Sequence, residues 1–278
     1  MFELVRGGAE KIPTPANFLS ASPDSTDSFP RDDIVKSHAP MYDRDGIAVF
    51  HGDCLDVLPT LPPTSVDFVL TDPPYLVGYE GRWDGDRKQI AGDADSGWLR
   101  PAFAEIWRVL NDDAFCVSFY GWPHADTFLC AWKSLGFRPV SHLALVKRQW
   151  GLGRFTRGTH ETAFLLAKGR PPKPERPLSD VLDWQRELER FHPNQKPVAS
   201  LIPMLVSLCP PGGLVLDPFM GSGSTLRAAK NLGLRAVGIE IEARFCATAV
   251  RRLAQQVIWP PVRRVPSSTP TLFSNADE

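Results

Sequence analysis

Short apolar runs alternate with amphipathic stretches from about residue 47 to residue 256. In the last stretch, Phe245, Ala249, Leu253 and Ile258 recur at helical spacing. This alternation favours an α/β fold in which most strands are parallel. We expect strands at 47–51, 66–71, 114–120, 138–147, 162–168, 213–217 and 235–240, and helices at 98–110, 124–136, 197–209, 223–233 and 242–256.

The two ends of the chain lack this pattern. Residues 1–38 are rich in Pro, Ser and Asp, and residues 265–278 are similar, so both are expected to be flexible arms. Residues 39–258 are expected to form one folded domain. Pro197 suits the first turn of a helix, and Asn194 could cap that helix.

Composition is that of an ordinary soluble protein, with 43% hydrophobic and 23% charged residues. No apolar run approaches the ~18–20 residues that a membrane-spanning helix needs, and the N-terminus lacks the pattern of a signal peptide. The five cysteines contain no C-x-x-C pair, which disfavours a disulfide framework and a zinc site. We therefore expect a cytoplasmic protein without a metal.

Charge is balanced overall, at 31 basic and 32 acidic residues, but it is unevenly distributed. Between Arg138 and Arg176 there are nine Lys or Arg and two acids. A solvated basic face is one interpretation. A phosphate-binding surface is the other, and the aromatic residues Trp150 and Phe155 within this segment favour it modestly.

The apolar run 66–71 ends in the tetrapeptide Asp72-Pro73-Pro74-Tyr75. This sequence supplies a carboxylate, backbone carbonyls without a ladder partner and a flat ring at the end of a buried strand. Such a set suits a planar ring that carries an amino group.

A glycine-rich segment, residues 217–225 (the glycine loop), follows a later strand. No lysine precedes Ser224 as a P-loop requires, and Leu226 stands where a nicotinamide fingerprint needs its third glycine. Asp217 and Glu240 end two successive strands, so they are expected side by side where ligands bind in open α/β sheets. Glu240 could hold the hydroxyls of a ribose and Asp217 an ammonium. The alternative is a plain strand-to-helix turn with a solvated glutamate.

Together, Phe219-x-Gly221-x-Gly223, Glu240 and the tetrapeptide resemble the amino-group DNA methyltransferases that use S-adenosylmethionine. The segments 192–197 and 160–168 resemble further blocks of that family. The tetrapeptide precedes the glycine loop, an order similar to the permuted β subclass, and the resemblance covers residues 41–256. It implies a Rossmann-like sheet, mostly parallel with an antiparallel strand, with circularly permuted motif order.

The resemblance also implies the substrate and the catalytic residues. Aspartate at the first position of the tetrapeptide implies methylation of adenine N6, with cytosine N4 as the alternative and RNA less favoured. A flipped base would stack on Tyr75, while Asp72 and the Pro73 carbonyl accept its amino hydrogens. The catalytic residues would be Asp72, Pro73, Pro74 and Tyr75.

The implied cofactor residues extend over most of the chain. Asp53 would contact the adenine of the cofactor, although it could instead, or in addition, cap the helix at 55–58. The residues implied to bind S-adenosylmethionine are Asp53, Cys54, Asp72, Asn194, Lys196, Pro197, Asp217, Pro218, Phe219, Gly221, Ser222, Gly223, Ser224, Thr225, Glu240 and Ile241.

Double-stranded DNA is the implied partner, and the segments 76–97, 147–160 and 170–191 are candidate insertions that contact it. Trp150 could stack on a base, or it could equally be a core residue beside a solvated basic loop. The segment before His192 is short for a recognition region, so a homodimer is plausible. Neither a recognition sequence nor a partner restriction enzyme is implied. The expected DNA-contacting residues are Lys147, Arg148, Trp150, Arg154, Arg157, Arg170 and Lys173.

Overall fold

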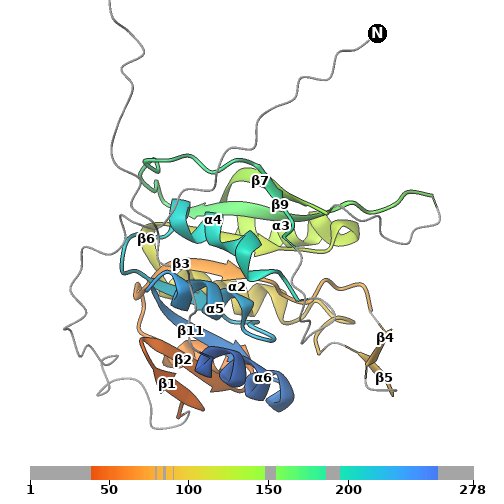
Figure 1. The fold of residues 1–278 in the computed structure, drawn as a ribbon. Helices are drawn as coiled ribbons and strands as arrows, with labels where there is room; N and C mark the ends of the chain where they lie inside the picture. Colours follow the sequence, from red (N-terminus) through yellow and green to blue (C-terminus); the bar gives the residue numbers. More distant parts are fainter. Residues whose placement is uncertain are drawn as a thin grey trace, which may run out of the picture.

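The computed structural model describes residues 39–78, 80–83, 86–89, 91–147, 155–185 and 195–255. Within these ranges a nine-stranded sheet has the order β1-β2-β11-β10-β3-β6-β8-β7-β9 (Figure 1). Its strands are β1 (Tyr42–Arg44), β2 (Ile47–His51), β3 (Val66–Thr71), β6 (Leu110–Phe119), β7 (Arg138–Val146), β8 (His160–Lys168), β9 (Val181–Asp183), β10 (Leu214–Asp217) and β11 (Arg235–Glu240).

Strand direction decides where side chains meet. The central strands β2, β11, β10, β3 and β6 are all parallel to one another, β8 is antiparallel to β6 and β7, and β1 is antiparallel to β2. The predicted fold class, a Rossmann-like sheet that is mostly parallel with an antiparallel strand, is thereby confirmed. The central strands therefore end at one edge of the sheet, here called the carboxyl edge, and β8 begins there.

Helices cover both faces of the sheet (Figure 1). One hydrophobic core contains buried residues of α4, α5 and α6, and the other contains buried residues of α1, α2 and α3. In α2 the buried positions Leu99, Ala102, Phe103 and Ile106 have the spacing of an amphipathic helix. The helices are α1 (Cys54–Val57), α2 (Leu99–Val109), α3 (Ala125–Ser134), α4 (Val198–Leu208), α5 (Ser224–Asn231) and α6 (Ala243–Ala254), with short 3-10 turns η1 (Leu58–Thr60) and η2 (Trp122–His124).

All the predicted strands and helices are present, with small shifts at their ends. Helix α4 begins at Val198, and Pro197 precedes it in extended conformation without a side-chain cap, so the prediction that Pro197 lies in the first helical turn is wrong. Asn194 and both predicted flexible arms lie outside the described residues. The predicted insertion 76–97 contains a two-stranded ribbon, β4 (Glu80–Trp83) and β5 (Asp86–Gln89), that projects from the body of the molecule (Figure 1).

None of the helices in the described ranges combines the length and the apolar character that crossing a membrane requires.

Candidate active site

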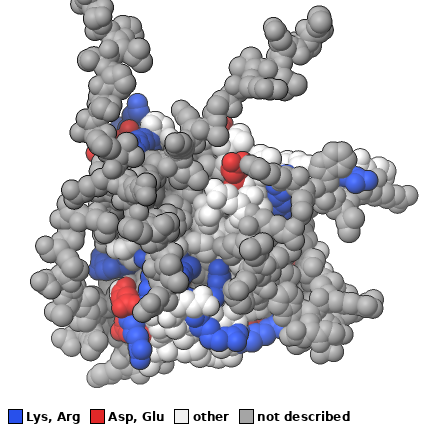
Figure 2. Space-filling model, viewed as in Figure 1, with Lys and Arg blue, Asp and Glu red and all other residues white. Residues whose placement is uncertain are grey.

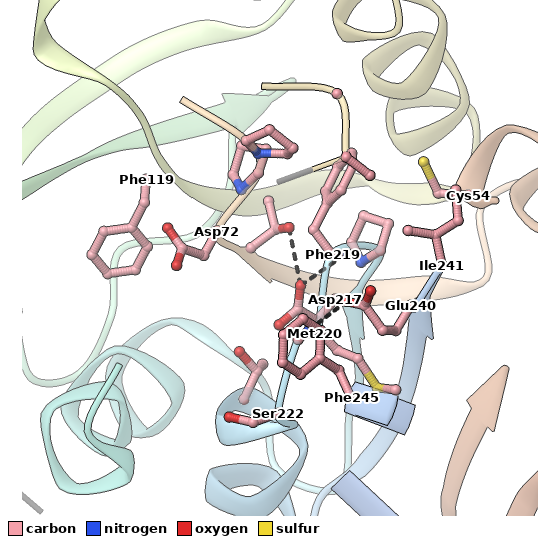
Figure 3. Close-up of a pocket in the computed structure, with 18 of the residues that line it drawn as sticks. Cys54, Asp72, Phe119, Asp217, Phe219, Met220, Ser222, Glu240, Ile241 and Phe245 are labelled. Atoms are coloured by element: carbon pink, nitrogen blue, oxygen red, sulfur yellow. Dashed lines mark hydrogen bonds between the residues drawn. The ribbon is translucent and has the colours of Figure 1, made fainter. Parts of the chain in front are cut away.

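A cavity of about 430 Å³ lies at the carboxyl edge of the sheet. Its volume is within the range of about 300–1,000 Å³ that is usual for small-molecule sites. Figure 3 shows Asp72 and Phe119 at one end of the cavity and Cys54 and Ile241 at the other, with Asp217 between them. The cavity therefore connects the tetrapeptide with the glycine loop.

Most of the residues predicted to bind a cofactor line this one cavity. Pro197 and Gly223 do not line it, and Asn194 lies outside the described residues. The structure thus places together side chains from opposite halves of the chain, although the roles predicted for them stay predictions. The predicted residues that line the cavity are Asp53, Cys54, Asp72, Pro73, Pro74, Tyr75, Lys196, Asp217, Pro218, Phe219, Gly221, Ser222, Ser224, Thr225, Glu240 and Ile241.

The glycine loop is held in place from helix α6. The buried Arg252 guanidinium donates to the Ser222 carbonyl at 2.7 Å and to the hydroxyls of Ser222 and Ser224 at 3.0 and 3.2 Å. Gly223 caps α5 with φ of 79°, and a Cβ atom there would lie 2.8 Å from the Ala249 side chain. Glycine is therefore required at this position both by its backbone angle and by the close approach of α6.

Asp217 lies at the end of β10, and the residue is only 3% exposed. Its Oδ1 atom accepts hydrogen bonds from the Thr71 hydroxyl at 3.0 Å and the Phe219 amide at 3.2 Å. Burial raises the pKa of Asp217 to about 7. A cationic group placed beside this carboxyl would favour its ionised form, as an ammonium group would do.

Glu240 ends the adjacent strand β11, two residues beyond Gly238, which pairs with Asp217. Its two carboxylate oxygens accept the Gly221 amide at 3.0 Å and the Glu242 amide at 2.8 Å. Burial nevertheless raises the pKa of this carboxyl. The backbone contacts fix its orientation toward the cavity, which it lines beside Ile241 (Figure 3).

Asp53 follows β2, the strand next to β11. Its side chain caps α1 by accepting a hydrogen bond from the Leu55 amide at 2.9 Å, which is one of the two roles predicted for Asp53. Asp53 also lines the cavity. Burial, with Asp53 beside it, raises the pKa of the Cys54 thiol to about 12. Cys54 is therefore a neutral, apolar wall of the cavity at physiological pH.

The tetrapeptide forms the other end of the cavity. The Tyr75 hydroxyl donates to Asp72 Oδ1 at 2.7 Å, and the Lys196 ammonium donates to Asp72 Oδ2 at 2.6 Å. Burial raises the pKa of Asp72, although the Lys196 ammonium opposes this effect. Lys196 was predicted to receive the carboxylate of the cofactor. In this structure its ammonium contacts Asp72, and the predicted contact stays a prediction.

Several cavity residues were not predicted as site residues. Phe119 ends β6, which pairs with β3, so its position beside Asp72 follows from strand order, which the sequence alone does not reveal. Trp98 packs edge-on against Phe219 with ring centroids 5.1 Å apart, and no sequence pattern marks it. Glu161 was noted within a family-like segment but was assigned no role. The unpredicted residues include Trp98, Phe119, Glu161, Gln195 and Phe245.

The predicted DNA contacts are divided between two edges of the sheet. At the carboxyl edge, Lys147 follows the end of β7, and the exposed Arg157 precedes the start of β8. The Lys147 ammonium donates a hydrogen bond to Glu161 at 2.5 Å. Because β8 runs antiparallel to β6, Arg170 and Lys173 follow its end at the opposite edge. Arg148, Trp150 and Arg154 lie outside the described residues.

The described surface shows no single basic face in the direction of Figure 2. Lys and Arg side chains gather there over α5 and α6, next to acidic side chains.

Among the residues that the structure describes, no group of three or more His, Cys, Asp or Glu is arranged to hold a metal ion.

Comparison with known proteins identifies the family. Residues 66–251 match the family model for N6 and N4 methyltransferases, described as DNA methylase. "Putative methylase YubD" of Escherichia coli (strain K12) is 48% identical over 203 residues, which cover 73% of this chain and 88% of that protein. "DNA adenine methyltransferase YhdJ" of the same organism is 26% identical over 250 residues, covering 76% of this chain and 84% of that protein.

A solved structure supports both the fold and the cofactor. The complex of M1.HpyAVI with S-adenosylmethionine has a TM-score of 0.60 and 26% identity, and the match covers 75% of this chain and 100% of the other. The buried carboxyls, glycine loop and cavity volume of the present chain fit the same cofactor. The chain therefore belongs to the DNA methylase family of N6 and N4 methyltransferases, and it uses S-adenosylmethionine.

Proposed function

We propose that the enzyme methylates the N6 amino group of adenine in double-stranded DNA. One observation carries this proposal: the Asp72 carboxylate and the Tyr75 and Phe119 rings line the end of the cavity that continues into the glycine loop (Figure 3). Aspartate at position 72 favours adenine within the family resemblance. The similarity to a relative named an adenine methyltransferase supports the same choice.

The target base must leave the duplex, because its amino group is inaccessible within the stack. Flipping costs a few kcal/mol, which contacts in the pocket must offset. Tyr75 provides a flat surface for the extruded base, and it is held by its hydrogen bond to Asp72. We infer that the base enters at the tetrapeptide end, since the glycine loop occupies the other side of the cavity.

An exocyclic amine is a weak nucleophile because its lone pair is delocalised into the ring. Asp72 and the Pro73 carbonyl would accept its two hydrogens and favour a pyramidal nitrogen whose lone pair is available. S-adenosylmethionine supplies the methyl group on a sulfonium. As the N–C bond forms, the S–C bond of the sulfonium would break and leave S-adenosylhomocysteine as the neutral thioether product, and the nitrogen would afterwards lose one proton to water. During this transfer the carboxylate of Asp72 would stabilise the positive charge on nitrogen, and the aromatic rings would add a cation–π contribution.

The pocket already stabilises a positively charged nitrogen. The Lys196 ammonium lies 4.7 Å from the centroid of the Phe119 ring and 5.3 Å from that of Tyr75. Both Asp72 oxygens have a donor here, but a carboxylate offers about four acceptor positions, so it can also accept the amino group of a base.

The decisive experiment identifies the methylated nucleoside. Duplex DNA and, in a separate reaction, RNA are incubated with the protein and isotopically labelled S-adenosylmethionine, digested, and analysed by mass spectrometry. We expect labelled N6-methyl-2′-deoxyadenosine. Labelled N4-methylcytosine would replace the adenine assignment with the cytosine alternative. Label in RNA alone, or in neither nucleic acid, would overturn DNA methylation as the activity of this chain.

We further propose that the enzyme acts as a homodimer, with one subunit supplying the chemistry and the other supplying DNA contacts. The reason is the short segment, residues 170–191, that is available for DNA recognition before His192. Sedimentation velocity at micromolar concentration, with and without duplex DNA, should detect the dimer. A monomer under both conditions would contradict this proposal and leave the catalytic assignment intact.

A further inference from the structure

A buried lysine joins two carboxylates at the tetrapeptide end of the cavity. The Lys196 side chain is 6% exposed, and its Nζ atom lies 2.6 Å from Asp72 Oδ2 and 2.9 Å from Glu161 Oε2. The same ammonium donates to the Tyr75 hydroxyl at 3.0 Å. The three partners come from the loop after β3 and from β8, while Lys196 itself precedes α4. The tetrapeptide, Glu161 and Lys196 are far apart in the sequence, and the fold brings them into contact.

A second lysine completes this charge cluster. Lys147, which follows β7, donates to Glu161 Oε1 at 2.5 Å. Burial opposes ionisation of Glu161, but the Lys196 and Lys147 ammonium groups outweigh it and lower the pKa of this carboxyl. Glu161 is therefore an anion. The cluster contains two ammonium groups and two carboxyl groups. The ionisation of Asp72 therefore depends on how strongly the ammonium groups interact with each of the two carboxyl groups.

The chemistry proposed above requires Asp72 to be ionised. A neutral carboxylic acid would stabilise a positive nitrogen poorly and would offer one acceptor fewer. Burial raises the pKa of Asp72, and Glu161 raises it further, while Lys196 lowers it. Asp217, at the end of β10, is a third carboxyl close enough to interact with Asp72 electrostatically. Lys196 is the cation in contact with Asp72, so its charge directly opposes these effects.

Lys196 itself stays positively charged. Burial would lower its pKa, but Asp72 and Glu161 raise it well above its ordinary value. Burial also raises the pKa of Tyr75 well above its ordinary value, so this hydroxyl stays neutral and can donate to Asp72. The charge of the Lys196 ammonium is accordingly constant across the pH range in which carboxyl groups titrate.

We propose that Lys196 and Glu161 are positioning residues that set the ionisation of Asp72 in opposite directions. Lys196 holds Asp72 as the carboxylate in a site where the Asp72 side chain is only 26% exposed. Glu161 contacts the same Lys196 ammonium and thereby reduces the stabilisation that Lys196 gives to the Asp72 carboxylate. This inference rests on the proposed role of Asp72 as an acceptor for the target amino group, but it can be tested without that reaction.

The test follows the titration of Asp72 directly. Protein labelled with ¹³C at the aspartate carboxyl carbons is titrated by NMR without DNA, and the Asp72 signal is assigned from its absence in Asp72→Asn. Lys196→Met should raise the midpoint of this titration by about 1–3 pH units, the range expected for loss of a neighbouring opposite charge. Glu161→Gln should lower the midpoint, because it removes an anion. Lys133→Met, an exposed lysine on α3, is the matched control and should leave it unchanged.

Turnover gives a second readout. Methyl transfer requires the carboxylate, so activity should fall as pH decreases through the Asp72 midpoint. The acid limb of the kcat profile should move to higher pH in Lys196→Met and to lower pH in Glu161→Gln. Lys196→Arg keeps the charge and should leave the limb close to that of the natural protein.

Opposite shifts distinguish this role from a purely structural one. Loss of activity in both variants with an unmoved Asp72 titration would overturn the proposal, as would shifts in the same direction. If Lys196→Met does not fold, Lys196→Arg and Glu161→Gln carry the test. If the titration shifts as expected but no variant, nor the natural protein, methylates DNA, then the proposed function fails while the electrostatic inference stands.

Discussion

Asp217 has a pKa near neutrality, so its predicted role in cofactor binding implies an affinity that depends on pH. Burial raises this pKa to about 7, so the carboxyl changes its charge between pH 6 and pH 8. If its partner is the ammonium of S-adenosylmethionine, binding requires the ionised form. Affinity should then increase by about fivefold from pH 6 to pH 7, following the ionised fraction of Asp217 over a range in which an α-ammonium group stays mostly protonated. Isothermal titration calorimetry at both pH values measures this change.

The ionised Asp217 carboxyl should lower the free energy of unfolding of the cofactor-free protein. Its folded-state pKa lies above the ordinary 3.8, so the folded state retains a proton that the unfolded chain loses. Stability therefore falls as pH rises from about 4 to about 7. Asp217→Asn should raise the melting temperature at pH 8 while abolishing the pH dependence of binding, whereas Asp43→Asn on β1 should do neither. A less stable Asp217→Asn protein at pH 8 would contradict this account.

Asp72 should affect the chemical step and not the affinity for the cofactor. Loss of one preorganised contact with the developing charge costs about 2.7–4 kcal/mol, or 10²–10³ in rate. Asp72→Ala should lower kcat by at least this factor. The dissociation constant of S-adenosylmethionine should change little, because the glycine loop and Glu240 are intact. Asp56→Ala, an exposed aspartate on α1, is the matched control. Near-normal turnover by Asp72→Ala would exclude the proposed mechanism.

At the scale of elements, the turn after β6 supports the tetrapeptide. A Cβ atom on Gly121 would lie 2.5 Å from the Tyr75 carbonyl oxygen and 2.9 Å from the Tyr75 Cβ atom. Gly121→Ala should therefore displace the tetrapeptide from its position against residue 121. We expect kcat to fall at least tenfold with cofactor affinity preserved, measured by single-turnover kinetics and calorimetry. Unchanged single-turnover kinetics would contradict this prediction, because the tetrapeptide would then move without slowing the reaction.

The elements that position the site were predictable because burial leaves a clear pattern. β10 is buried at every position, and β3 and β11 at most of theirs, so they form apolar runs of strand length. The short edge strands β1 and β9 were not predicted, since each has three residues and is largely exposed. Too few positions are buried there to produce a pattern.

The contacts of single charged residues were not predictable in the same way. Sequence motifs marked Lys196 and Glu161, but they did not indicate that the two residues form an ion pair. That contact depends on β8 running antiparallel beside β6, which brings Glu161 to the carboxyl edge. The direction of a strand is a property of the assembled sheet and leaves no trace in the residues of that strand.

At the scale of the whole molecule, strand direction also separates the predicted DNA contacts. Arg157 precedes β8 and Arg170 follows it, so the length of β8 lies between them. Eight residue steps at about 3.3 Å correspond to roughly 26 Å. A duplex whose target base enters the cavity must lie across the carboxyl edge, where Arg157 is exposed. Contacts from Arg170 or Lys173 would require the same duplex to reach the opposite edge.

We therefore expect charge reversal to have opposite outcomes at the two edges. Arg157→Glu should weaken binding to duplex DNA and reduce the slope of log K against log salt concentration by about 0.9, the value for one lost phosphate contact. Lys173→Glu makes the same change of charge at the opposite edge and should leave both quantities unchanged. Fluorescence anisotropy across a salt series measures both variants. Equal losses would mean that the protein responds to net charge alone, and a larger loss for Lys173→Glu would place the duplex on the other edge of the sheet.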